Sequence, residues 1–165
     1  MGTFKVKGGN NLSGVIIPQG AKNEALQVIS AVLLTEKIVT IDNIPNIIDV
    51  NRLIDLLDNL GVTVKKINQN KYSFESKNID LDYLNTSDFE TKAKGLRGSI
   101  MIIGPLLSRF GKASIPKPGG DKIGRRKLDT HFEGLVKLGA NFKYDNKNYR
   151  YNVTAVSYTH LRAHE

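Results

Sequence analysis

Apolar positions recur every three or four residues in two segments, and this spacing predicts two amphipathic helices. The first helix is expected over residues 22–35, and its apolar face is formed by Ala25, Leu26, Ile29, Val32 and Leu33. The second is expected to end at Gly61, and its apolar face is formed by Val50, Leu53, Ile54, Leu57 and Leu60. Short alternating runs predict strands at 3–7, 12–17, 37–42, 62–66 and 71–75.

The order helix, strand, helix, strand, strand then recurs along the chain. "LLTEKIVTI" (33–41) matches "LLSRFGKASI" (106–115) at an offset of 73, and "LDNLGVTVKK" (57–66) matches "LVKLGANFKY" (135–144) at an offset of 78. We interpret this as an internal repeat. The larger second offset places an insertion between the matched blocks, in the stretch that holds "KPGGDKIGRR", and such an enlarged loop is where we expect function.

Composition narrows the class of protein without choosing a function. The 165 residues are 40% hydrophobic and include no cysteine, so we expect one globular domain without disulfides, thiolate chemistry or Cys-based zinc sites. The absence of a long apolar run or an N-terminal apolar core predicts a cytoplasmic protein. His160 and His164 have helical spacing, but two ligands make a poor metal site, so no metal is expected. The net charge of +8 indicates an anionic partner, which the charge alone leaves open among nucleic acid, phosphorylated metabolites and a membrane surface.

Two groups of residues are candidates for chemistry. Lys22 and Asn23 begin the first helix, where free backbone N–H groups and the helix dipole favour a phosphate, and Arg97 lies at about the same place near the start of the third helix. The simpler alternative for Lys22 is an ordinary surface lysine. Asp121 follows Gly119 and Gly120, so its loop has the freedom to fold over a ligand. Basic residues surround this carboxylate, namely Lys117, Lys122, Arg125, Arg126 and Lys127. The alternative here is a solvated basic loop.

Four motifs in register, "GAKNEAL" (20–26), "LRGSIMIIGPLLSRFG" (96–111), "PGGDKIGRRKLDTH" (118–131) and "GLVKLGA" (134–140), resemble the N-terminal part of the UDP-N-acetylglucosamine 1-carboxyvinyltransferases, a family of enolpyruvyl transferases. The resemblance implies an α/β fold, the inside-out α/β barrel of these enzymes, which has two domains of three similar units. This chain would hold nearly two of the six units. The implied reaction is transfer of the enolpyruvyl group from phosphoenolpyruvate to the 3′-hydroxyl of UDP-N-acetylglucosamine with release of phosphate, the first committed step of peptidoglycan synthesis, without a cofactor.

The same resemblance implies that residues 1–21 are strands that normally belong to the second domain and that 22–154 are an incomplete first domain. Residues 155–165 fit neither repeat and continue no apolar periodicity, so they are expected to be a non-native tail. In the family the second domain supplies an aspartate general base and further arginines. The chain is therefore expected to need its missing C-terminal domain and to be inactive alone.

Site residues follow from the resemblance position by position. Phosphoenolpyruvate would be bound by Lys22, Asn23 and Arg126. UDP-N-acetylglucosamine would be bound by Asn23, Arg97, Arg126, Lys127, Leu128, Asp129 and Thr130, of which Lys127 and Thr130 depart from the family pattern. Asp121 takes the catalytic loop position, which most often holds a cysteine that fosfomycin alkylates. Asp49 is a further candidate near the site.

Three other interpretations of the chain compete with this one. The sister enzyme acting on shikimate 3-phosphate shares the fold and the lysine of the first helix, but it lacks the "PGGDKIG" loop. A basic nucleic-acid-binding module would suit the charge of +8, but the chain has no Trp and only 7% aromatic residues. A fragment without function is the third. The residues favour small-molecule substrates over nucleic acid or a membrane.

Overall fold

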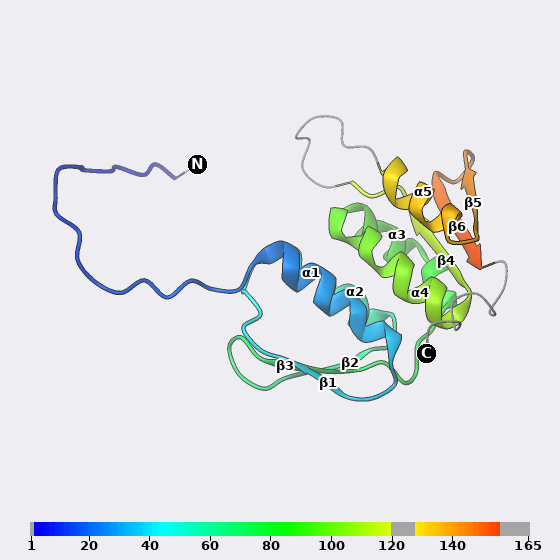
Figure 1. Ribbon diagram of the computed structural model, residues 1–165, viewed down its shortest axis with the longest axis horizontal. Helices are drawn as coiled ribbons and strands as arrows, with labels where there is room; N and C mark the ends of the chain where they lie inside the picture. Colours follow the sequence, from blue (N-terminus) through cyan, green and yellow to red (C-terminus); the bar gives the residue numbers. More distant parts are fainter. Residues whose placement is uncertain (1, 120–127, 156–165) are drawn as a thin grey trace.

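The computed structural model describes residues 2–119 and 128–155. This part of the chain contains two units of the same design, joined by a helical connection (Figure 1). The internal repeat predicted from the sequence is thereby confirmed. No helix within the described ranges has the length and apolar character that crossing a membrane requires.

The first unit has two helices, a helical turn and a three-stranded sheet: α1 (Lys22–Ala31), the 3-10 turn η1 (Val32–Leu34), β1 (Val39–Ile41), α2 (Ile48–Asn59), β2 (Thr63–Lys66) and β3 (Tyr72–Glu75). The sheet has the order β1-β3-β2 with both pairings antiparallel. The apolar positions predicted for the two helices are buried, except that Ile54 is only partly buried. Periodicity therefore identified both helices and the faces that they bury.

The second unit repeats this order with η3 (Arg97–Ile102), α4 (Ile103–Phe110), β4 (Lys112–Pro116), α5 (Asp129–Lys137), β5 (Ala140–Asp145) and β6 (Arg150–Ala155). Its sheet has the order β4-β6-β5, so the last strand again lies between the other two. The register repeats as well. Val64 pairs with Phe74 in the first sheet, and Phe142 pairs with Val153 in the second.

The connection between the units contains η2 (Asp82–Asn85) and α3 (Ser87–Lys94), neither of which was predicted from the sequence. Only Phe89 and Ala93 of α3 are buried, so the segment carries little apolar periodicity. The sequence feature that marks α3 is its N-cap. The Thr86 hydroxyl accepts a hydrogen bond from the Phe89 N–H at 3.1 Å and caps the helix. Arg97 is the first residue of η3, which continues directly into α4, so it lies at the start of the helical segment that corresponds to α1, as expected.

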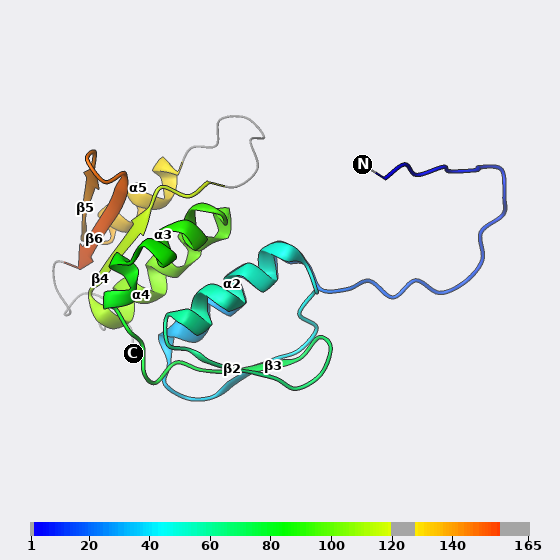
Figure 2. The same ribbon diagram turned by 180° about the vertical axis from the view of Figure 1, so that it is seen from behind.

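The helices α1 to α4 lie between the two sheets (Figures 1 and 2). Side chains with almost no exposure fill the space between these elements, among them Ile29, Leu33, Leu53, Phe89 and Leu106. Burial of such side chains contributes roughly 1.5–3 kcal/mol each. The contact between the units is thus a hydrophobic core made by helices.

Residues 2–21 extend away from both units (Figure 1) and have no regular secondary structure. The strands predicted at 3–7 and 12–17 are wrong for this chain. A strand needs a neighbour to accept its backbone hydrogen bonds, and no strand among the described residues pairs with this segment. Its apolar side chains are exposed, with Phe4 at 96% and Ile16 at 92%, so the segment buries nothing that would hold it in place.

Candidate functional site

Several helices begin at one end of the molecule. α1 begins at Lys22, α2 at Ile48, η3 at Arg97 and α5 at Asp129, and Figures 1 and 2 show these first turns on the same side. Free N–H groups and the positive ends of helix dipoles make such an end favourable for anions. The elements that carry Lys22, Asp49, Arg97 and Asp129 therefore begin at this end of the molecule.

Two glycines allow close contacts near this end. A Cβ on Gly20 would lie 2.0 Å from the backbone oxygen of Asn43, so only glycine lets the chain enter α1 along this path. A Cβ on Gly98 would lie 3.1 Å from Leu26 Cδ1. The start of η3, and with it Arg97, is thus packed directly against α1.

Lys22 and Asp49 form an ion pair across the first turns of α1 and α2. The side chains are 42% and 31% exposed, so solvent reaches both. An exposed pair contributes ~0–1 kcal/mol to stability, which is too little to explain it as a fold determinant. It does hold the ammonium group at a position where a phosphate would meet both the lysine and the helix end.

The other predicted residues divide between the described and the undescribed parts of the chain. Asn23 is exposed in the first turn of α1, and Arg97 is half-buried at the start of η3. Leu128 is buried with 9% exposure and packs in the core. Asp129 and Thr130 are exposed in the first turn of α5. Asp121, Arg126 and Lys127 lie outside the described residues.

The backbone leading towards Asp121 is held at two points. The Lys117 N–H donates to the Tyr149 oxygen at 2.9 Å, and the Gly119 N–H donates to the Lys94 oxygen at 3.0 Å. Lys94 is the last residue of α3, three positions before Arg97. The structure therefore brings the base of this segment to the end of the molecule that carries Lys22, Asp49 and Arg97.

An aromatic groove of about 620 Å³ lies between α5 and the strands β5 and β6. Phe132, Phe142, Tyr144 and Tyr151 line it, and the rings of Phe132 and Phe142 have centroids 4.3 Å apart. Burial raises the pKa of the Tyr151 hydroxyl above its usual value. This groove was not predicted from the sequence, although the spacing of Phe142 and Tyr144 along β5 is a signal for one aromatic face.

No three His, Asp or Glu side chains gather as a metal site would require within residues 2–119 and 128–155. His131 is exposed in the first turn of α5. His160 and His164 lie outside the described residues.

Comparison with known proteins decides the family. Residues 6–164 match the family described as EPSP synthase (3-phosphoshikimate 1-carboxyvinyltransferase). The chain belongs to this family. A solved structure, the enolpyruvyl transferase NikO from Streptomyces tendae, has the same fold, with a TM-score of 0.69 and 19% sequence identity over 90% of this chain and 31% of that one. The enolpyruvyl transferase fold expected from the sequence is confirmed, and in the described part it forms two units without a closed barrel.

Curated relatives of the chain share one name, UDP-N-acetylglucosamine 1-carboxyvinyltransferase. The protein from Bacteroides thetaiotaomicron is 57% identical over 155 residues, which cover 94% of this chain and 36% of that protein. The protein from Porphyromonas gingivalis is 53% identical with the same coverage. The protein from Borreliella burgdorferi is 42% identical and covers 85% of this chain. The chain spans about a third of the length of these relatives.

Proposed function

We propose that the full-length protein transfers the enolpyruvyl group of phosphoenolpyruvate to the 3′-hydroxyl of UDP-N-acetylglucosamine in the cytoplasm, and that this chain carries one side of the site. The observation that carries the proposal is the Lys22–Asp49 pair at the joined starts of α1 and α2. Relatives named for this reaction are 53–57% identical over 94% of the chain, which supports the choice of acceptor.

The first role is to bind phosphoenolpyruvate. Lys22 would bind its phosphate together with the free N–H groups of the first turn of α1, and Asn23 would donate an amide hydrogen bond. A hydrogen bond between charged groups contributes ~1.5–3 kcal/mol. Asp49 would hold the Lys22 ammonium in place before the substrate arrives and share it afterwards. Arg126 is proposed to add a second cation.

The second role is to bind the UDP-sugar. Arg97 at the start of η3, and Asp129 and Thr130 at the start of α5, are proposed to contact it. Together with Arg126 and Lys127 they would bind the diphosphate and the uridine. The buried Leu128 would support this segment from the core while its backbone remains available.

The reaction itself transfers one proton on to C3 and then removes one. The 3′-hydroxyl oxygen gives its proton to a general base and bonds to C2 of phosphoenolpyruvate as C3 takes a proton. The tetrahedral intermediate then breaks its C2–O bond to phosphate as C3 gives up a proton. The cations of this chain would stabilise the departing phosphate. An unperturbed Asp carboxyl has a pKa of about 3.9 and a Cys thiol about 8.5. Asp121 would therefore position charge rather than donate a proton, unless the bound substrates raise its pKa.

The remaining groups are proposed to come from a C-terminal domain, which would supply an aspartate general base and further arginines. Residues 2–21 are proposed to pair with that domain. Their exposed apolar side chains, including Val6, Leu12 and Val15, support this, because pairing with a second domain would remove these side chains from water.

An acceptor comparison tests the proposal. The full-length protein is incubated with phosphoenolpyruvate and either UDP-N-acetylglucosamine or shikimate 3-phosphate, and phosphate release is measured. Release that depends on the UDP-sugar is expected. Release with shikimate 3-phosphate alone would instead support the activity in the family's description. Binding of oligonucleotides without release of phosphate with either acceptor would support a nucleic-acid-binding module.

A further inference from the structure

One face of α2 carries two side chains that reach other elements. Asp49, in the first turn of α2, forms the ion pair with Lys22 of α1. Arg52 follows three positions later, so the two side chains are neighbours on the helix surface. The Arg52 guanidinium donates a hydrogen bond to the Gly95 oxygen at 3.2 Å. α2 therefore contacts the start of α1 and the end of α3 through adjacent side chains.

The Gly95 oxygen lies just before Arg97 in the chain, and the backbone around Arg97 is fixed on both sides. Leu96 is 1% exposed and packs in the core. The Ser99 hydroxyl is fully buried and donates to the Ala93 oxygen at 3.0 Å. This short stretch of chain therefore has little freedom to move by itself, and Arg97 lies in its middle.

α1 contacts the same stretch from another side. A Cβ on Gly98 would lie 3.1 Å from Leu26 Cδ1 and 3.3 Å from Leu26 Cδ2, so the backbone directly after Arg97 lies against the α1 side chain. The backbone of Arg97 is thus placed by α1 through Leu26 and by α2 through Arg52. These are the two helices whose first turns form the ion pair of the candidate site.

The hydrogen bond from Arg52 is not needed to keep the helices together. Arg52 and Gly95 are both exposed. Buried apolar side chains between the helices, such as Leu53 and Phe89, keep α2 and α3 in contact without it. What the hydrogen bond adds is direction, because its geometry fixes how the Gly95 peptide is oriented.

We propose that Arg52 is a positioning residue for the binding of UDP-N-acetylglucosamine, and that it fixes the backbone of Arg97 relative to the Lys22–Asp49 pair. This inference rests on the proposed role of Arg97 in binding the UDP-sugar. Arg52 acts through Arg97 and does not itself contact the substrate. Loss of its hydrogen bond lets the Gly95 peptide turn, so that ordering Arg97 on the substrate costs more free energy when the substrate binds.

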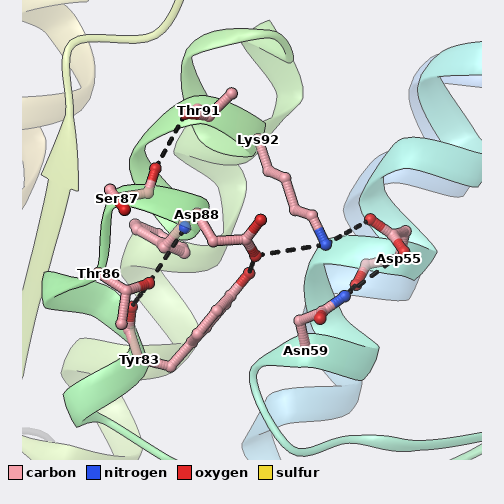
Figure 3. Close-up of polar contacts among 9 residues, drawn as sticks. Asp55, Asn59, Tyr83, Thr86, Ser87, Asp88, Thr91 and Lys92 are labelled. Atoms are coloured by element: carbon pink, nitrogen blue, oxygen red, sulfur yellow. Dashed lines mark hydrogen bonds and ion pairs between the residues drawn. The ribbon is translucent and has the colours of Figure 1, made fainter.

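The test compares Arg52→Met, Arg97→Met and the double variant in the full-length enzyme. Arg52→Met removes the donor and keeps the aliphatic stem. Calorimetry gives the Kd of UDP-N-acetylglucosamine, phosphate release gives KM for phosphoenolpyruvate, and thermal melting gives stability. Lys92→Met is the matched control, because the Lys92 ammonium also joins α3 to α2, lying 3.0 Å from Asp55, but one helical turn before Gly95 (Figure 3).

We expect Arg52→Met to raise the Kd of UDP-N-acetylglucosamine about 3- to 10-fold, the effect of one hydrogen bond, and to leave KM for phosphoenolpyruvate within about 2-fold. Arg97→Met should raise the Kd by about 10-fold or more. The double variant should bind within about 2-fold of Arg97→Met, because Arg52 then has no side chain left to position. Lys92→Met should bind the UDP-sugar like the wild type and melt at about the same temperature as Arg52→Met.

Three results would overturn the inference. The first is an Arg52→Met enzyme that binds UDP-N-acetylglucosamine as tightly as the wild type. The second is a double variant in which the two effects add, because Arg52 would then act on the substrate independently of Arg97. The third is equal weakening by Lys92→Met, which would make Arg52 one of several general attachments of α3.

A second variant serves if Arg52→Met does not fold. Arg52→Gln places its amide nitrogen two bonds closer to the backbone than the donor nitrogen of arginine, and it is judged by the same comparison. Failure of the proposed function is distinguishable from failure of this inference. In that case the wild-type enzyme itself would neither bind UDP-N-acetylglucosamine nor transfer the enolpyruvyl group to it.

Discussion

Arg109 and Glu36 occupy the same position in the two repeats, and they bind each other. They are 73 residues apart, which is the offset of the first matched block, and Arg109 Nη2 lies 3.0 Å from Glu36 Oε1. The same guanidinium also donates to the Leu33 oxygen at 3.1 Å and to the Ser76 oxygen at 2.7 Å. Equivalent positions of the two repeats thus meet where the two units are in contact.

Loss of this arginine should destabilise the contact between the units. The Arg109 side chain is only 15% exposed, whereas Glu36 is 67% exposed. Arg109→Met leaves two carbonyl groups without this donor, so we expect a loss of about 2–4 kcal/mol in the free energy of unfolding. Glu36→Gln should change it by less than ~1 kcal/mol. Urea unfolding of the full-length protein measures both, and equal effects of the two variants would contradict the assignment.

The Tyr83–Asp88 hydrogen bond of 2.5 Å should make stability depend on pH at both extremes (Figure 3). The hydrogen bond from Tyr83 lowers the pKa of Asp88, so this stabilisation is present above the unfolded pKa of about 3.9 and is lost as pH falls through the folded value. Burial, and then Asp88, raise the pKa of Tyr83. Above about pH 10 the unfolded Tyr83 ionises first, which favours unfolding.

Tyr83→Phe tests both arms of this pH dependence. The stability difference between wild type and variant should be constant from about pH 5 to 9 and shrink beyond either limit. Asp88→Asn should remove the acid arm and retain the part of the alkaline arm that burial of Tyr83 causes. A stability difference that stays the same across the whole range would show that this pair does not titrate with folding.

Lys22→Ala in the full-length protein should abolish use of phosphoenolpyruvate and leave the fold intact. The Lys22–Asp49 pair is exposed, so its loss should change the free energy of unfolding by at most ~1 kcal/mol. Lys37→Ala, another exposed lysine of the first unit, is the control. Steady-state phosphate release and circular dichroism give the two readouts. Normal turnover by Lys22→Ala would remove Lys22 from the proposed site.

Asp121 should make the enzyme resistant to fosfomycin. The antibiotic alkylates a thiolate in the family, and a carboxylate is a weaker nucleophile towards an epoxide. Asp121→Cys should become sensitive and keep activity. The aspartate form should also lose activity at a lower pH than the cysteine form if this group must be protonated to act, given unperturbed pKa values of about 3.9 and 8.5. Covalent labelling of the unmodified protein by fosfomycin, seen by mass spectrometry, would refute the resistance.

The 165-residue chain should have no enolpyruvyl transferase activity by itself. It covers 36% of the Bacteroides thetaiotaomicron relative, and the proposed site needs groups from a second domain. Purified chain is therefore expected to release no phosphate from phosphoenolpyruvate and UDP-N-acetylglucosamine. Addition of the separately produced remainder of the protein is the control. Turnover by the 165-residue chain alone would show that one domain suffices.

The amino-acid sequence determined the repeat and most of its elements. Periodicity located α1 and α2, and the matched blocks predicted a second unit of the same order. These predictions succeed because they depend on neighbours within a few residues, where the spacing of apolar side chains selects helix or strand. α3 was not predicted because only Phe89 and Ala93 form its apolar face. Its capping residue, Thr86, was the signal in the sequence that could have identified it.

Contacts between distant segments were decided only by the tertiary structure. The sequence presents Leu60 and Leu138 as equivalent, yet Leu60 is 0% exposed and Leu138 is 67% exposed. The partner that covers a helix face is not encoded near that face. In the same way, the sequence marked Lys22 and Asp49 as separate candidates, and only the packing of α1 beside α2 brings their charges into contact. Local pattern fixes which face is apolar, whereas the approach of remote segments decides which face is buried and which charges meet.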